Sequence, residues 1–320
     1  MAELTRFNAT SSERESWAFP RSLAQIGIRL SPNFYKTKPN GKRETVAVAD
    51  ELKVSLTFDV DTIALWMGTQ DSTAFSRGEF GVVGTERILK LLKQYEILGT
   101  FFVPGITATT YPQLVESIAN HGHEVAHHGN HHESPARMDR SQELEALEAG
   151  ASILEAIAGN RPVGWRSPGW YVSEHSLELL LENGFIYDSS LMGHDIEPYW
   201  CRVGDRWEKG GGIEWGAKVD LVEFPIAWHL DDFPWFEYIP PRGGNLTAAS
   251  AVLETWLGDL DWALQNGGSG VLTYTMHPQV IGRGHRMLML EKLINEVAKR
   301  EVAFVTLEKA ALQWRQEQTS

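Results

Sequence analysis

The sequence VSLTFDVD, residues 54–61, is an apolar run that ends in two carboxylates, Asp59 and Asp61. Residues i and i+2 of an extended chain point to the same side, so both carboxylates are expected to face one site. Two close carboxylates repel each other, and the pKa of one is raised unless a cation compensates. A strand that ends in solvated acids would look the same in sequence, so this motif alone indicates only a candidate site.

Around this run, short apolar segments alternate with longer amphipathic ones, which predicts a parallel sheet of the α/β class. Seven or eight strand–helix units favour closure into a barrel over residues 51–320. Residues 1–50 carry scattered prolines and charges without periodicity, and we interpret them as an N-terminal extension that wraps over the body or mediates assembly. Further strands are expected at 99–103, 124–128, 164–166, 185–188, 222–228, 271–276 and 303–307, and helices at 85–97, 111–120, 139–158, 173–181, 247–266 and 286–300.

Composition restricts the partners. The chain has 29 Lys and Arg against 42 Asp and Glu, a net charge of -13, so nucleic acid and anionic lipid are unfavourable partners. The single cysteine, Cys201, leaves no intrachain disulfide and no Cys-based zinc motif. Neither a signal-peptide core in residues 1–20 nor a run of about 20 apolar residues is present, so we predict a cytoplasmic protein without membrane contact.

Six of the eleven histidines lie in residues 121–132. Imidazole is the commonest metal ligand, and i, i+4 spacing places two rings on one side of a turn. Three pairs have this spacing, His123/His127, His127/His131 and His128/His132, and spacing does not choose among them. One Asp with two His leaves open positions on a divalent ion, with zinc expected first and Mn, Co, Ni or Fe as alternatives.

Two later segments also end apolar runs. Arg166, in GWRSPGW (164–170), could hold a nearby carboxylate in its ionised form, and the Pro-Gly turn would present Trp170 as a flat wall. His277, after the run VLTYTM, could be a general acid for a leaving amine. A surface arginine, a core tryptophan and a core or capping histidine are the simpler interpretations.

Taken in order, these segments resemble the polysaccharide deacetylase (NodB-homology) superfamily from about Val54 to Leu307. The resemblance implies a distorted (β/α) barrel, commonly of seven parallel strands. It also implies residue roles: catalytic base, Asp59; metal ligands, Asp61, His128 and His132; orientation of the base, Arg166; general acid, His277; a position beside the site, Asp188.

The chain departs from the common family pattern. Val60 separates the two acids, Gly169 precedes Trp170, and the segment after His277 is unusual. These features resemble a subgroup with cyclic imide hydrolases, allantoinase-like enzymes and a cytoplasmic peptidoglycan-deacetylase-like branch.

The segment FPIAWHLDDFPWF (224–236) resembles a loop of this subgroup that lies near the substrate. Walls made by Trp170 and Trp228, with Asp231 from the same loop, would suit a compact planar ring. A hydrophobic loop packed under the rim is the equal alternative.

The main prediction is therefore a metal-dependent hydrolase of non-peptide C–N bonds that opens a small cyclic amide, imide or ureide. De-N-acetylation of amino sugars in polysaccharide or peptidoglycan is the first alternative, and a non-catalytic metal- or sugar-binding module is the second. The subgroup resemblance and the N-terminal segment suggest a homodimer or homotetramer.

Overall fold

The computed structural model describes residues 52–67, 72–239 and 243–319. The predicted extension at residues 1–50 lies outside this range, so its role stays a prediction. Among the described residues, no helix combines the length and the hydrophobicity that crossing a bilayer requires.

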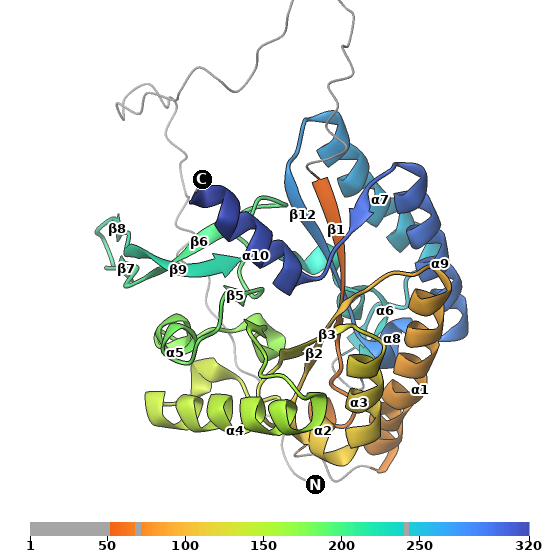
Figure 1. The fold of residues 1–320 in the computed structure, drawn as a ribbon, viewed down its shortest axis with the longest axis horizontal. Helices are drawn as coiled ribbons and strands as arrows, with labels where there is room; N and C mark the ends of the chain where they lie inside the picture. The colour runs from red at the N-terminus through yellow and green to blue at the C-terminus, as the bar shows by residue number, and fades with distance from the viewer. Residues whose placement is uncertain (1–51, 68–71, 240–242, 320) are drawn as a thin grey trace, which may run out of the picture. The chain divides into compact units, whose positions relative to one another are not determined.

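One curled, mostly parallel sheet organises the described chain (Figure 1). Seven neighbouring strands are parallel, β6 (Tyr199–Val203) is antiparallel to β9, and β13 (Ala303–Phe304) pairs with β1. The sheet ends at β12 and β6, so the described strands form an open half-barrel, and the predicted α/β fold of about seven parallel strands is confirmed. In sheet order the parallel strands are β12 (Gly270–Met276), β1 (Leu52–Asp59), β2 (Thr100–Val103), β3 (Glu124–His127), β4 (Gly164–Trp165), β5 (Tyr187–Asp188) and β9 (Ala217–Glu223).

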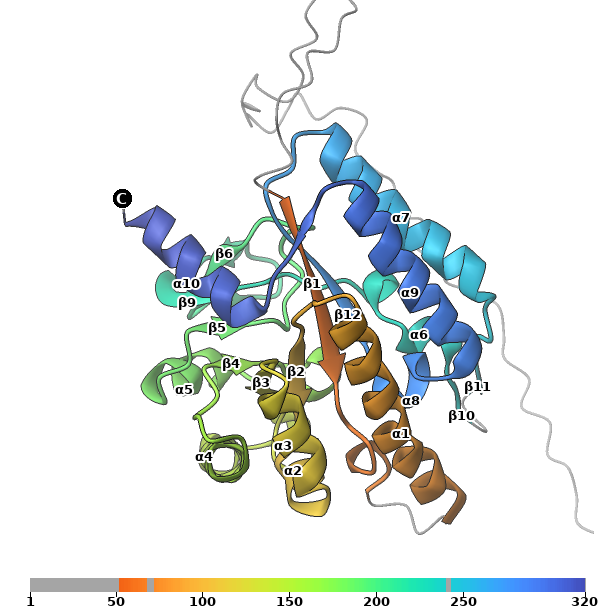
Figure 2. The ribbon, with the colours of Figure 1, turned by 45° about the vertical axis from the view of Figure 1, so that its right-hand side comes forward.

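Helices pack on the outside of this sheet, and Figure 2 shows α1, α7 and α9 beside β1 and β12. Two small ribbons, β7 (Arg206–Trp207) with β8 (Ile213–Glu214) and β10 (Tyr238–Ile239) with β11 (Gly243–Gly244), complete the strands. The α-helices are α1 (Ser72–Gln94), α2 (Gly105–Thr110), α3 (Pro112–Asn120), α4 (Arg140–Ala158), α5 (Ser176–Glu182), α6 (Phe233–Phe236), α7 (Ala249–Gln265), α8 (Pro278–Ile281), α9 (Gly284–Lys299) and α10 (Leu307–Gln318).

Helix α1 begins well before the predicted residue 85. Its first half carries Gly78, Gly81 and Gly84, which lower helix propensity by about 1 kcal/mol each and so hid the helix. In the fold these glycines allow close backbone contact. A Cβ added at Gly78 would lie 2.7 Å from the carbonyl oxygen of Thr62, so packing outweighs propensity here.

Strand β1 is buried on both faces. Leu52, Val54, Leu56 and Phe58 pack into the main apolar core with residues of α1, α7 and α9. The alternating side chains, including Thr57 and the terminal Asp59, therefore point to the interior of the curled sheet. Burial on this side brings a carboxylate into a region where it needs a partner.

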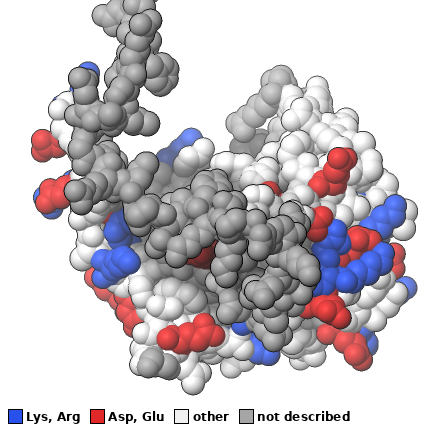
Figure 3. Space-filling model, turned by 90° about the horizontal axis from the view of Figure 1, so that it is seen from above, with Lys and Arg blue, Asp and Glu red and all other residues white. Residues whose placement is uncertain are grey.

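One face of the described structure carries both signs of charge. On the face drawn in Figure 3, acidic and basic side chains are interspersed wherever described residues are visible. Local ion pairs, such as Arg300 with Asp261 and Glu296, fit this pattern.

Candidate active site

Three metal-binding side chains meet beyond the carboxyl ends of β1 and β3. The Oδ1 atom of Asp61 lies 3.4 Å from Nε2 of His128 and 3.5 Å from Nε2 of His132. His128 directly follows β3, and His132 has a left-handed backbone, with φ of 60°. The ligand atoms of the three residues lie within 4.8 Å of one another, so a single ion could contact all three.

The tautomer of His128 is determined by its neighbour. Its Nδ1 lies 2.8 Å from the carbonyl oxygen of Arg166, which can only accept, so Nδ1 carries the proton. In the neutral ring, Nε2 then has a free lone pair on the side of Asp61. A histidine held in this way is the usual arrangement for a metal ligand.

The Oδ1 atom of Asp61 is buried and receives no hydrogen bond in the described structure. Burial alone would raise the pKa of Asp61, but His132, His128 and His277 together lower it, which favours the charged carboxylate. An anionic oxygen without a donor, beside two imidazoles, fits a divalent cation. The residues present therefore form a divalent metal site of the Asp-His-His type.

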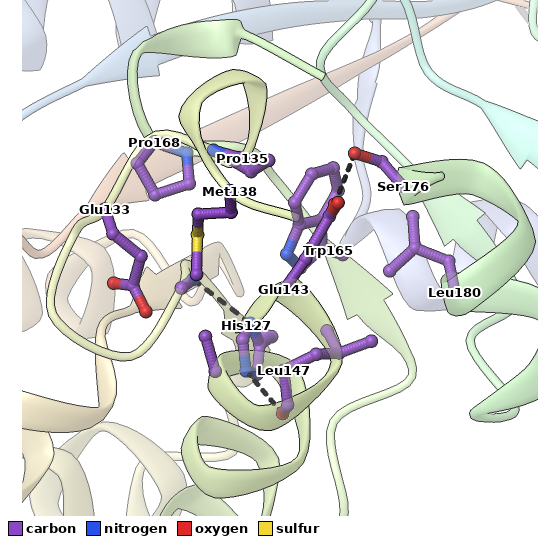
Figure 4. A pocket seen from close by; sticks show the side chains of 12 residues that line it. His127, Glu133, Pro135, Met138, Glu143, Leu147, Trp165, Pro168, Ser176 and Leu180 are labelled. Atoms are coloured by element: carbon purple, nitrogen blue, oxygen red, sulfur yellow. Dashed lines mark hydrogen bonds between the residues drawn. The ribbon is translucent and has the colours of Figure 1, made fainter. Parts of the chain in front are cut away.

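Two other histidines of the cluster have structural roles. The Nε2 atom of His127 donates to the carbonyl oxygen of Leu147, and its Nδ1 accepts from the backbone of Gly129. Burial lowers the pKa of His127 to about 3 and that of His123 to about 4, so both are neutral. His127 also borders a cavity with room for about one water molecule, shown in Figure 4.

Asp59 is paired with a buried arginine. Nη1 of Arg166 donates to Oδ1 of Asp59 at 2.9 Å and to Thr57 at the same distance. Nε and Nη2 donate to the carbonyl and the hydroxyl of Ser189. The guanidinium is thus held by Thr57, Asp59 and Ser189, and its hydrogen bond orients the Asp59 carboxylate. Thr57 and Ser189 were not predicted as site residues. In the sequence, only their positions inside the TFD and YDSS segments point to the site.

His277 faces both carboxylates. Its Nε2 lies 4.0 Å from Oδ2 of Asp59 and 3.8 Å from Oδ2 of Asp61. Burial alone would lower the pKa of His277, but Asp231, Asp232 and Asp61 raise it well above the usual range. The charged form of the ring is therefore favoured, as a proton donor requires.

The other ring nitrogen of His277 is held by two acids from the loop after β9. Nδ1 lies 2.8 Å from Asp232 and 3.4 Å from Asp231. Asp231 was predicted to contact the substrate, yet it is 2% exposed and its Oδ1 accepts from the backbone of Phe233. The structure therefore assigns Asp231 to the support of His277. Asp232 was missed, although the adjacent acids in LDD were a visible signal.

The two predicted wall residues touch each other. The rings of Trp170 and Trp228 stack with centroids 4.1 Å apart and an angle of 28° between planes. No planar ring fits between the two side chains in this arrangement, so any pocket they wall lies beside the stacked pair. Trp228 remains 47% exposed, so its outer face is the surface open to a ligand, and a substrate contact there stays a prediction.

Asp188 is fully buried and accepts from the hydroxyl of Ser190. Its strand neighbours in register are Trp165 and Glu223. The Trp165 side chain belongs to an apolar cluster of its own with residues of α4, α5, β6 and β9. Burial raises its pKa to about 6, next to Glu223. A place of Asp188 beside the substrate stays a prediction.

Solvent reaches the cluster through two residues. The side chains of His132 and His277 are 15% and 11% exposed, whereas those of Asp59, Asp61, His128 and Arg166 are at most 1% exposed. The ion position between Asp61 and the two histidines, the base held by Arg166 and the acid at His277 thus lie in one cluster, with His132 and His277 as its partly exposed members. This set suits hydrolysis of an amide by an activated water molecule.

The chain belongs to the polysaccharide deacetylase family, whose profile matches residues 48–187, and it is a hydrolase of non-peptide C–N bonds. It is 36% identical to a peptidoglycan deacetylase of Helicobacter pylori over 82% of this chain and 96% of that protein. It is also 34% identical to a Mycobacterium smegmatis protein of known structure, assigned as a polysaccharide deacetylase, with a TM-score of 0.75 over 91% of this chain and 96% of that one.

A crystal structure of the PuuE allantoinase has the same fold. Its TM-score is 0.68 at 21% identity, over 83% of this chain and 90% of that one. This likeness concerns the fold alone.

Proposed function

We propose that this protein is a metal-dependent de-N-acetylase that releases acetate from N-acetylated amino sugars of peptidoglycan. The observation that carries the proposal is the similarity to the Helicobacter pylori peptidoglycan deacetylase along 96% of that protein. The ring-opening activity expected first from the sequence has weaker support, because the likeness to the allantoinase extends only to the fold.

The ion would be held by Asp61, His128 and His132, and zinc is the proposed metal because one carboxylate and two imidazoles suit it. When bound, such an ion supplies a Lewis acid and lowers the pKa of a water molecule.

Asp59 is the proposed proton acceptor. Arg166 holds Oδ1 at 2.9 Å, while Oδ2 is directed toward Nε2 of His128 and His277. The free oxygen can therefore take a proton from the attacking water. Because the hydrogen bond from Arg166 orients the carboxylate, the free oxygen of Asp59 is placed to act as the general base.

His277 is the proposed proton donor to the departing sugar nitrogen. Its Nδ1 is held by Asp232 and its Nε2 faces the centre of the site. Since the loop acids favour the imidazolium, the ring can protonate the amine as the C–N bond breaks. The amine then leaves as a neutral group and acetate remains.

The test is turnover of the metal-loaded protein on matched substrates. N-acetylglucosamine oligomers and peptidoglycan fragments are assayed for acetate, and cyclic imides, a hydantoin and allantoin for ring opening. Acetate release that a chelator removes and metal restores supports the proposal. Ring opening without acetate release would replace it with the cyclic-amide function.

The predicted homo-oligomer and cytoplasmic location stay predictions. Light scattering after size exclusion measures the first, and fractionation of the source cells measures the second.

A further inference from the structure

Helix α8 places one more polar side chain against the metal site. Nε2 of Gln279 lies 3.3 Å from Oδ2 of Asp61, and the two residues are 5% and 1% exposed. A carboxylate oxygen only accepts, so the amide nitrogen of Gln279 must be the group that faces Asp61.

The two oxygens of Asp61 therefore have different surroundings. Oδ2 receives the hydrogen bond from Gln279, while Oδ1 faces His128 and His132 without a donor. A carboxylate held by one oxygen cannot rotate freely about its last bond. Gln279 thus keeps Oδ1 directed at the two histidines.

Gln279 is itself held on a rigid support. A Cβ added at Gly84 of α1 would lie 2.0 Å from the carbonyl oxygen of Pro278, and one at Gly282 would lie 2.5 Å from the Cα of Gly84. The two backbones thus touch at glycines on both sides of Gln279. Such contact leaves α8 little freedom to move relative to α1.

The carbonyl oxygen of the Gln279 side chain forms no hydrogen bond with the described residues. This atom, Oε1, is buried. A buried carbonyl without a donor is unfavourable. An apolar residue of equal length would avoid this cost, so the benefit of glutamine lies in the contact with Asp61.

We propose that Gln279 is a positioning residue of the metal site, which fixes the Asp61 carboxylate so that Oδ1 is presented to the ion. The inference rests on the metal site of the proposed function and does not depend on which substrate is hydrolysed. Outer contacts of this kind typically contribute about 10- to 100-fold to metal affinity or activity.

The experiment compares Gln279→Met with the unchanged protein and with Gln265→Met, a control at an exposed position near the end of α7. The dissociation constant for Zn²⁺ is measured by competition with a chromophoric chelator, without any turnover. The thermal midpoint of the metal-free protein is measured in parallel, because a purely structural role would appear there.

For Gln279→Met we expect Zn²⁺ affinity to fall by about 10-fold or more, with the metal-free midpoint within about 3 °C of the unchanged protein. Gln265→Met should change neither quantity. A folded Gln279→Met protein that binds Zn²⁺ within about twofold of the unchanged affinity would overturn the proposal. If that variant unfolds, Gln279→Leu is judged by the same criterion.

The result is separable from the fate of the proposed function. A protein whose zinc affinity depends on Gln279 but which releases no acetate would contradict only the deacetylase activity. Unchanged zinc binding in Gln279→Met, with normal acetate release in the unchanged protein, would contradict only the positioning role.

Discussion

Arg166 and Asp59 form an ion pair with 2.9 Å between Nη1 and Oδ1, and neither side chain is more than 1% exposed. Asp59 is the last residue of β1 and Arg166 directly follows β4, and these two strands are separated in the sheet by β2 and β3. The pair therefore bridges the interior of the curled sheet, from one strand end to another. The same ion pair thus stabilises the fold and orients Asp59, the proposed base.

Replacement of Arg166 by Met should lower the free energy of unfolding by about 3–5 kcal/mol, because it leaves Asp59 buried without a partner. Urea unfolding followed by circular dichroism measures this loss. The control is Arg140→Met, which breaks the exposed pair with Glu182 and should cost about 1 kcal/mol or less. Equal effects of the two variants would contradict the role given to Arg166.

Asp59→Asn should reduce turnover by about a hundred- to ten-thousand-fold, because the amide cannot take a proton from water. Metal content, measured by elemental analysis, should stay unchanged since Asp59 is outside the ligand set. Normal turnover in a metal-loaded Asp59→Asn protein would show that another group is the base.

His127 and His128 are adjacent in sequence, yet replacing His128 should remove the metal, whereas replacing His127 should lower stability and leave the metal bound. His128→Leu removes a ligand, so the bound metal should be lost. His127→Leu leaves the Leu147 carbonyl and the Gly129 amide unpaired, which should cost about 1–3 kcal/mol of stability while metal remains. Metal loss in a folded His127→Leu protein would contradict this division.

Glu124 should make stability depend on pH. Its carboxylate accepts from Thr100, from Tyr187 and from the backbone of Glu308 in the first turn of α10. Burial nevertheless raises the pKa of Glu124 from 4.5 to about 7. A raised folded-state pKa means that its contribution is complete below about pH 4.5 and is lost as the pH rises through 7.

The measurement compares the unchanged protein with Glu124→Gln, which does not titrate. As the pH rises from 4 to 8, the free energy of unfolding of the unchanged protein should fall by about 3 kcal/mol relative to that of Glu124→Gln. A difference that stays constant over this range would show that the folded structure does not change the pKa of Glu124.

Gly84→Ala tests the support of α8. The added Cβ would meet the Pro278 carbonyl, so stability should fall by about 1–3 kcal/mol, and zinc affinity should fall with it because Gln279 moves. The matched control is Gly258→Ala in α7, where the new Cβ meets nothing within 4 Å. That change should stabilise the protein by about 0.5–1 kcal/mol, as thermal unfolding with and without zinc would measure.

Local pattern was sufficient for the parallel sheet and for the first candidate site residues. In the run 54–61, apolar side chains occupy one face of the strand, and the other face ends in Asp59 and Asp61. Strand β1 and its two carboxylates could therefore be predicted without knowledge of their neighbours. The resemblance to a known family then selected His128 and His132 from the three pairs that spacing left open. The glycines of α1 misled the prediction, because propensity is local whereas the benefit of glycine lies in contact with Thr62 and Pro278.

Sequence by itself determined the type of sheet, the edge at which chemistry collects and the donor types available to a metal, since these depend on periodicity and side-chain chemistry. Only the tertiary structure decided that Asp232 holds His277, that Gln279 holds Asp61 and that Trp170 stacks on Trp228. Each of these contacts joins residues at least 45 positions apart. Which residues meet over such separations depends on how the sheet curls and how the helices pack. A short sequence pattern does not specify either of these.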